Sequence, residues 1–316
     1  MLEVKINLFA DFQEIFQNWA RNNIASGVLG IKYVGRQKDK IEPWLQEASF
    51  GAVMEYLHQI IIPIPRNIHI CKKFIASGEN QRDVETILQI ARDGGDLMQY
   101  LGSGIRKLDA PDALLNLWGI VHFHMKPHGK REAKNDNCLL FAYVTDKDFY
   151  VLGLGGHKDL YETRFIKILQ SEFPEALAGY LVSEKPVVDI DSAEYEKLRK
   201  CNVNAIVSIN GCSYCSPGGG VLSNGKSAKS YCEMAMPLRC RLDSASKDLE
   251  QWFLNGLEKL SSGRVAKIAI NRVNLKLVKF QDDEILVSCP ELGLIISYRD
   301  GTREMAIVYE KAENGE

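Results

Sequence analysis

The sequence predicts an α+β protein with mostly antiparallel sheet, in which a helix–meander core is flanked by mixed α/β subdomains. Three observations lead to this class. Segments with helical spacing of apolar residues recur along the chain, short apolar or alternating runs lie between them, and several of these runs are joined by short turns. A length of 316 residues is enough for two or three subdomains of ordinary size.

Residues 1–78 are predicted to form an N-terminal α+β subdomain. Apolar residues at helical spacing predict helices over 9–22 and 41–60, and a strand is predicted at 30–36. The segment 60–70 carries two prolines, which favours a loop or an edge strand.

Residues 79–184 are predicted to contain helices, then a three-stranded meander and one more helix. The first helical pattern covers 80–101, with a break at Gly94–Gly95. The turn "TDKD" between two apolar runs predicts a hairpin. The strands are expected within 114–126 and 137–158, and the last helix at 161–173.

Residues 185–316 are predicted to form a C-terminal α+β domain with a long helix and antiparallel strands. A helix is expected at 191–200 and a strand at 204–209. The segment 244–263 has a clear apolar stripe and predicts an amphipathic helix. The strand-rich end includes the turn "RDGT", which predicts a hairpin.

Composition excludes some functional classes. The formal net charge is −2, so no global basic field points to nucleic acid, and an RNA-binding role would need a local basic patch. The first residues lack the pattern of a signal peptide, and no apolar run is long enough to span a bilayer. We therefore expect a cytoplasmic protein with no membrane partner. Its eight cysteines are then expected to be thiols or metal ligands.

The stretch "WGIVHFHMKPHGK" (118–130) holds three of the six histidines of the chain. Side chains alternate between the faces of a strand, so His122, His124 and Lys126 are expected to share one face. The other face would pack on a core through Val121, Phe123 and Met125. The following residues add Lys130 and Arg131 to a locally basic segment.

Three interpretations of this strand remain open. It can be a half-exposed strand beside a solvated loop. It can be a metal site, in which the HxH pair and His157 supply imidazole ligands. It can also be a site that binds or cleaves a phosphodiester, where histidine acts as acid or base and lysine or arginine neutralises the phosphate.

The segment of about 82–170, with "LLNLWGIVHFHM" and "VLGLGGHKDLY", resembles the core of RelE/HigB-type mRNA interferase toxins. The resemblance implies an antiparallel meander closed by a G–H–[RK]–x–x–Y segment, matched here by His157, Lys158 and Tyr161. It also implies ribonuclease activity and a protein partner, such as an antitoxin. The chain departs from the family pattern because His122 and His124 stand where arginines are usual.

Four cysteines lie close together in the sequence, as Cys212, Cys215, Cys232 and Cys240. They allow a structural zinc site, although a second tight pair is missing. The alternative is a set of ordinary buried or surface thiols.

The stretch "GVLSNGKS" (220–227) satisfies the G-x4-G-K-S spacing of a phosphate-binding loop. A strand should run directly into the first glycine and a helix should follow, and neither is predicted here. A glycine-rich hairpin or a flexible loop is the favoured interpretation.

The favoured function is an RNA-cleaving or RNA-binding protein of the toxin or phage-defence type. His122, His124, His157 and Lys126 are the expected catalytic residues, and the expected substrate-binding residues are Lys130, Arg131, Lys158 and Tyr161. No cofactor is expected beyond a structural zinc at the four cysteines. The alternative functions are a non-catalytic protein-interaction module and a nucleotide-dependent enzyme that uses Gly220–Ser227.

Overall fold

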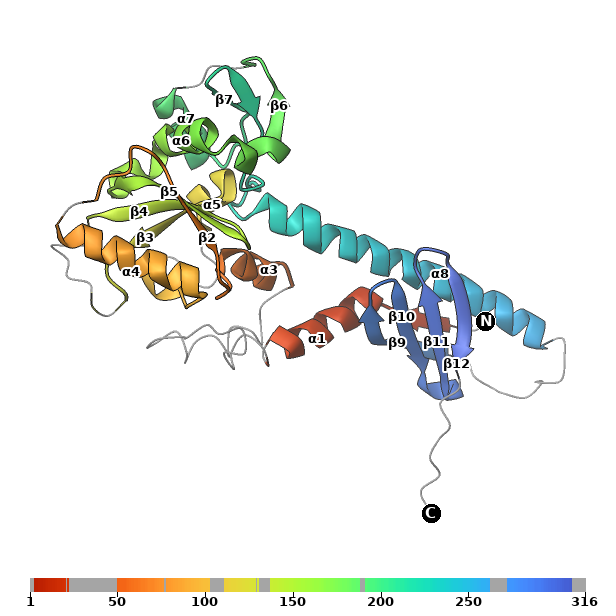
Figure 1. Cartoon of the computed structure of the whole chain (residues 1–316). Helices are drawn as coiled ribbons and strands as arrows, with labels where there is room; N and C mark the ends of the chain where they lie inside the picture. The colour runs from red at the N-terminus through yellow and green to blue at the C-terminus, as the bar shows by residue number, and fades with distance from the viewer. Residues whose placement is uncertain are drawn as a thin grey trace. The chain divides into compact units, whose positions relative to one another are not determined.

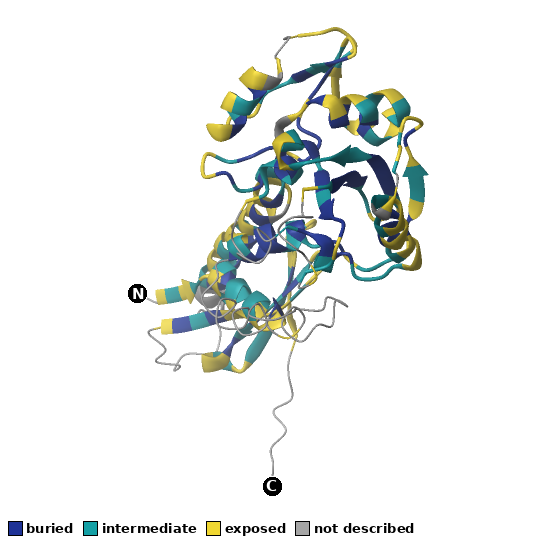
Figure 2. Cartoon of the chain, turned by 90° about the vertical axis from the view of Figure 1, so that its left-hand side faces the viewer, coloured by how far each residue is buried: buried dark blue, intermediate teal, exposed yellow. Residues whose placement is uncertain are grey.

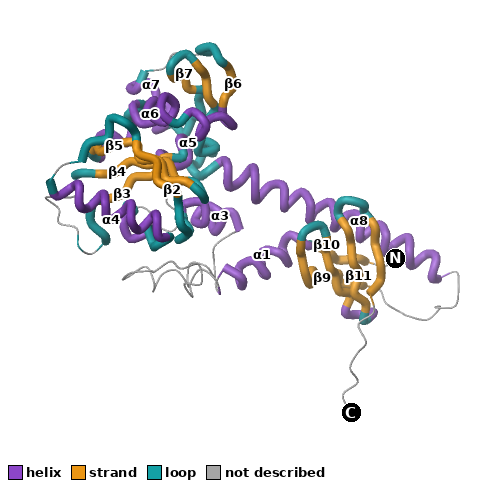
Figure 3. Tube along the Cα trace, in the orientation of Figure 1, coloured by secondary structure: helices purple, strands orange, loops and turns teal. Residues whose placement is uncertain are grey.

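The computed structural model divides the chain into two compact units. The larger unit is the continuous segment Ala20–Glu233, and the smaller unit combines Met1–Trp19 with Met234–Glu316. The fold is α+β, as predicted (Figures 1 and 3). None of the helices described is long and apolar enough to cross a membrane. The structure describes residues 3–20, 22, 50–76, 78–102, 111–128, 130, 137–187, 191–261 and 272–308.

A four-stranded sheet forms the centre of the larger unit, in the order β2-β5-β4-β3. Strands β3, β4 and β5 pair antiparallel as the predicted meander, and β2 adds to β5 in parallel. The elements of this part are α3 (Phe50–Gln59), β2 (Asn67–Ile70), α4 (Glu79–Asp93), η3 (Met98–Tyr100), α5 (Ala113–Trp118), β3 (Ile120–His124), β4 (Leu139–Val144), β5 (Asp148–Gly155), η5 (His157–Tyr161), α6 (Arg164–Glu172) and η6 (Pro174–Tyr180).

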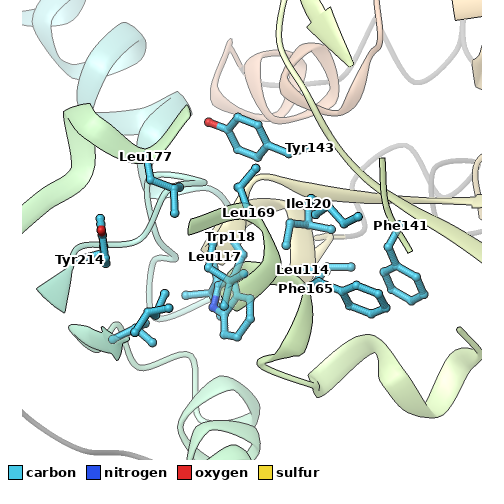
Figure 4. Close-up of a cluster of buried hydrophobic side chains, with 14 of the residues drawn as sticks. Leu114, Leu117, Trp118, Ile120, Phe141, Tyr143, Phe165, Leu169, Leu177 and Tyr214 are labelled. Atoms are coloured by element: carbon cyan, nitrogen blue, oxygen red, sulfur yellow. The ribbon is translucent and has the colours of Figure 1, made fainter. Parts of the chain in front are cut away.

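Both faces of this sheet are covered, and most buried residues of its strands lie between the covering layers (Figure 2). On one face, α4 packs Val84 and Ile87 against Phe123. On the other face, α5 and α6 contribute a second apolar cluster that includes Trp118, Ile120 and Phe141 (Figure 4). Val121, Phe123 and Met125 all belong to the α4 side, which confirms the predicted alternation of β3.

A second, three-stranded antiparallel sheet completes the larger unit, in the order β6-β8-β7. Its core residues Val207, Ile209 and Tyr214 join the same cluster as Trp118. The helix α7 (Ser192–Lys200) begins at Asp191, whose carboxylate accepts a hydrogen bond of 2.8 Å from the backbone N–H of Glu194. The strands are β6 (Leu181–Ser183), β7 (Val207–Ile209) and β8 (Cys212–Tyr214), and the unit ends at Glu233, within the π-helical segment η7 (Ser230–Ala235).

The smaller unit is a five-stranded sheet packed against α1 (Leu8–Ala20) and α8 (Met236–Ser261). The strand order is β1-β9-β10-β11-β12, antiparallel except for the parallel β1–β9 pair. The Tyr298 hydroxyl donates a 2.8 Å hydrogen bond to Asp248 and ties the sheet to α8. The strands are β1 (Glu3–Ile6), β9 (Arg272–Gln281), β10 (Glu284–Cys289), β11 (Leu294–Arg299) and β12 (Glu304–Val308), with η8 (Pro290–Leu292) between β10 and β11.

The three predicted subdomains do not coincide with the two units. Strand β2 lies before the predicted boundary at 78/79 but pairs with β5. The boundary at 184/185 separates β6 from β8, which pair with each other. Strand β1 belongs with β9, near the other end of the chain. These pairings join distant segments. The two parallel pairs make two of the three described sheets mixed, while most of the described strand pairs are antiparallel.

One local expectation is corrected. Residues 114–118 were expected in a strand and form α5 instead, because Asp112 caps this short helix. The Asp112 carboxylate accepts hydrogen bonds of 3.0 Å from the N–H groups of Leu114 and Leu115. Gly119 then ends the helix with φ 68°, a backbone conformation that favours glycine. The predicted strand at 30–36 lies outside the described residues.

Candidate functional site

Three histidines predicted from the sequence come together beside the sheet of the larger unit. His122 and His124 project from the face of β3 that also carries Ile120, since side chains alternate along a strand. His157 begins η5, directly after β5. The ring centroids are 6.0 Å apart for His122 and His124, 5.5 Å for His124 and His157, and 6.5 Å for His122 and His157. We call these three residues the histidine cluster.

The three imidazoles differ in exposure. His124 is buried, with 3% of its surface exposed, His122 is half-buried and His157 is exposed. The cluster thus runs from the interior of the sheet to the surface. His122 also contacts the ring of Phe141, which stacks on Phe165 at 4.0 Å.

The turn that carries His157 is held by one carboxylate. Asp159 Oδ2 accepts a hydrogen bond of 2.8 Å from the Gly156 N–H and pairs with Arg164 Nη2 at 2.9 Å. Arg164 also donates to the Leu154 carbonyl at 3.1 Å and lies over the Phe165 ring. These contacts fix η5 against the end of β5.

The glycines of "VLGLGGHK" make room for these partners. A Cβ on Gly155 would lie 2.5 Å from Asp159 Oδ2 and 2.6 Å from Arg164 Nη2, and one on Gly153 would lie 3.3 Å from the Phe165 ring. Larger residues at either position would displace the side chains that support the histidine turn.

Gly102 lies against the histidine pair of β3. A Cβ there would be 3.1 Å from His122 Nε2 and 3.7 Å from His124 Nε2. Gly102→Ala is therefore expected to displace the His122 ring, while the His124 ring stays in ordinary van der Waals contact. We expect the side-chain imidazole NMR signals of His122 to shift, while those of His69, on β2, stay in place. Unchanged signals from His122 would contradict this geometry.

The other residues predicted for the site lie in different places relative to the cluster. Lys126 lies beyond the end of β3 and forms a 2.7 Å ion pair with Asp83 of α4, the helix that covers the opposite face. Lys130 and Lys158 are exposed. Arg131 lies outside the described residues, and Tyr161 is the last residue of η5. The face shared by the histidines therefore does not extend to the ammonium of Lys126.

The four cysteines predicted as zinc ligands lie on separate elements. Cys212 is half-buried on β8, and Cys215 follows with its Sγ 3.4 Å from the Tyr180 carbonyl oxygen. Cys232 and Cys240 are exposed, on η7 and α8, and Cys240 belongs to the smaller unit. Across the part of the chain that the structure describes, no three His, Cys, Asp or Glu side chains are grouped so that they could hold a metal ion.

Residues 216–227 form a glycine-rich hairpin docked on α5, as the favoured interpretation predicted, and a helical segment begins at Ala228, where none was predicted. Val221 and Ser227 pair in an antiparallel bridge. The N–H groups of Gly218 and Gly220 donate to the carbonyls of Leu117 and Asn116, at 3.1 and 2.8 Å. These amides satisfy the open carbonyls at the end of a helix and so do not face a phosphate. This geometry argues against the nucleotide-dependent alternative.

Comparison of the chain with protein-family models, curated proteins and solved structures gave no significant match. The resemblance to RelE/HigB-type toxins stays a prediction.

The sequence did not point to three residues that shape the site. Gly102 follows a helical pattern and comes to the cluster because Leu101 bridges Phe123 of β3. Asp159 and Arg164 could have been suspected, since an acidic residue shortly after a Gly–Gly pair often accepts a backbone N–H in a tight turn.

Proposed function

We propose that the protein is an RNA-cleaving protein of the toxin or phage-defence type, and that the histidine cluster carries its phosphodiester chemistry. The observation that supports this most is the approach of three imidazoles to ring-centroid distances of 5.5 to 6.5 Å, with His157 exposed to solvent. Imidazole is the side chain best suited to proton transfer near neutral pH.

The proposed reaction uses the ribose 2′-hydroxyl as nucleophile. One neutral imidazole accepts the proton of this hydroxyl while its oxygen attacks phosphorus. A second, protonated imidazole donates a proton to the departing 5′-oxygen. The products are a 2′,3′-cyclic phosphate and a 5′-hydroxyl end. The exposed Lys158 beside His157 is placed to attract the phosphate.

A second candidate is a non-catalytic protein-interaction module. It is favoured by the charge around the cluster, because Lys126 and Arg164 are already paired with Asp83 and Asp159. Under this view the histidines are polar residues at the edge of a packed sheet, and the flanking elements carry the binding surface.

Inducible expression in a bacterial host separates the two candidates. Wild type is compared with the triple variant His122→Ala/His124→Ala/His157→Ala, with growth and total RNA followed together. Growth arrest with RNA loss that disappears in the triple variant supports the ribonuclease. Intact RNA, with purified protein also inactive on RNA, supports the interaction module.

A further inference from the structure

A second group of polar side chains is buried where the segment 216–230 meets α3 and α5. Glu55, Asn116, Ser227 and Ser230 are each at most 3% exposed. None of these residues belongs to the histidine cluster. Buried polar groups of this kind need hydrogen-bond partners, since an unsatisfied one costs about 1–3 kcal/mol.

The Glu55 carboxylate is the anchor of this group. It accepts hydrogen bonds from the Ser227 N–H at 2.7 Å and from Asn116 Nδ2 at 3.3 Å. Asn116 Nδ2 also donates to the Gly225 carbonyl at 3.3 Å, so the same side chains hold the returning side of the hairpin. Among the described residues no cation forms an ion pair with Glu55, although buried carboxylates usually have one.

His58 lies one helical turn after Glu55 on α3. Its Nε2 is buried and has no hydrogen-bond partner among the described residues. Burial lowers the pKa of His58, and the nearby Lys229 lowers this pKa further. The carboxylates of Glu55, Asp112 and Glu233 act in the opposite direction and offset only part of the shift. Burial of the imidazole and the charge of Lys229 therefore favour the neutral form of His58.

We propose that protonation of His58 controls the docking of the glycine-rich segment 216–230, which stays on α3 and α5 while His58 is neutral and is released when His58 takes up a proton. In the released state the imidazole is solvated and has its ordinary pKa of about 6.5. The released state then binds the proton more tightly than the docked state. The docking free energy is fully present above that pH and declines as the pH falls below it. One proton is involved, so the docking equilibrium changes by at most about tenfold per pH unit.

Amide hydrogen exchange of the full-length protein tests this proposal. Exchange of Gly220, Ser227 and Ala228 is measured at about pH 7.5 and about pH 5.5, on either side of the ordinary imidazole pKa, and corrected for the intrinsic rate. In wild type we expect protection of these amides to be about tenfold lower at the acidic pH. In His58→Gln the protection should no longer depend on pH. Wild-type protection that is the same at both pH values would overturn the proposal, and so would a fall that persists in His58→Gln.

Two controls keep the test decisive. His69→Gln removes an imidazole that is paired with Asp148 on the edge of the sheet, and should retain the wild-type pH dependence. Glu55→Gln weakens the anchor, so protection of Ser227 should be lower at both pH values while the dependence on pH remains.

If His58→Gln does not fold, the imidazole of His58 is titrated by NMR in wild type. A pKa at or above that of free histidine would refute the proposal. This inference stands independently of any ribonuclease activity.

Discussion

If the histidine cluster cleaves RNA as proposed, replacing His157 with alanine is expected to lower the kcat of that cleavage by about 10²- to 10⁴-fold, the contribution typical of a general acid or base. His157 is the exposed member of the cluster, so its loss should leave the fold intact. The half-buried His122 is expected to show a loss of similar size. The measurement is the initial rate of cleavage of a single-stranded RNA by purified protein, with the product ends identified as cyclic phosphate.

Matched variants decide how this result is interpreted. His69→Ala removes a histidine outside the cluster, and Lys126→Ala removes a cation that is paired with Asp83. Both should stay within about tenfold of wild type, since neither group transfers a proton. Removal of two cluster histidines together should cost little more than removal of one, because groups that act as a unit are not additive. Equal losses in His69→Ala and His157→Ala would refute the assignment. Loss of activity with a chelator, restored by metal, would assign the cluster to metal binding instead.

Gly218→Ala is expected to destabilise the larger unit by about 3 kcal/mol, near the upper end of the usual cost of overpacking. An added Cβ would overlap the carbonyl oxygen of Leu115, and it would also lie within 2.5 Å of the Asn116 carbonyl oxygen. Both atoms are backbone and cannot move aside as a flexible side chain would. The Gly218 N–H would then lose its bond to Leu117 at the end of α5. Urea denaturation measures the change.

Two controls belong to this prediction. Gly179→Ala adds the same methyl group at a position where nothing lies within 4 Å, and should change stability little. Lys226→Ala removes the lysine of "GVLSNGKS" and should be nearly neutral for stability. Among the described residues, the hydrogen bonds of Lys226 that hold the hairpin are made by its backbone, with Leu222 and Asn224. A Gly218→Ala protein as stable as Gly179→Ala would contradict the close packing. Nucleotide binding that is lost in Lys226→Ala would revive the nucleotide-dependent alternative.

The alternation of β3 and the approach of the histidines could be predicted from the sequence. Period-two alternation places His122 and His124 on one face with no knowledge of the rest of the fold. The hairpin between β4 and β5 then brings Gly155 opposite Leu139, the residue that pairs with His124, and His157 follows two residues later. The cluster is therefore a consequence of local patterns and one short turn.

The rest could not be predicted because it depends on distant contacts. The parallel pairing of β2 with β5 and of β1 with β9 joins distant segments, and the local sequence pattern of a strand does not indicate which strand it pairs with. Lys126 was predicted to share the histidine face. However, β3 ends at His124, and the Lys126 side chain reaches Asp83 on α4. The burial of Glu55 also had no local signal, since its partners Asn116 and Ser227 come from other parts of the chain.

The discontinuous smaller unit has a consequence for the order of folding during translation. The segment Ala20–Glu233 is complete while the strands β9–β12 are still unmade, so the histidine-bearing unit can fold first on the ribosome. Strand β1 cannot pair until β9 has been synthesised. The apolar side of α8 stays uncovered until the last strands leave the ribosome. A ribosome that stalls before residue 272 would therefore release a chain with a folded larger unit and an exposed hydrophobic helix, which chaperones and proteases recognise.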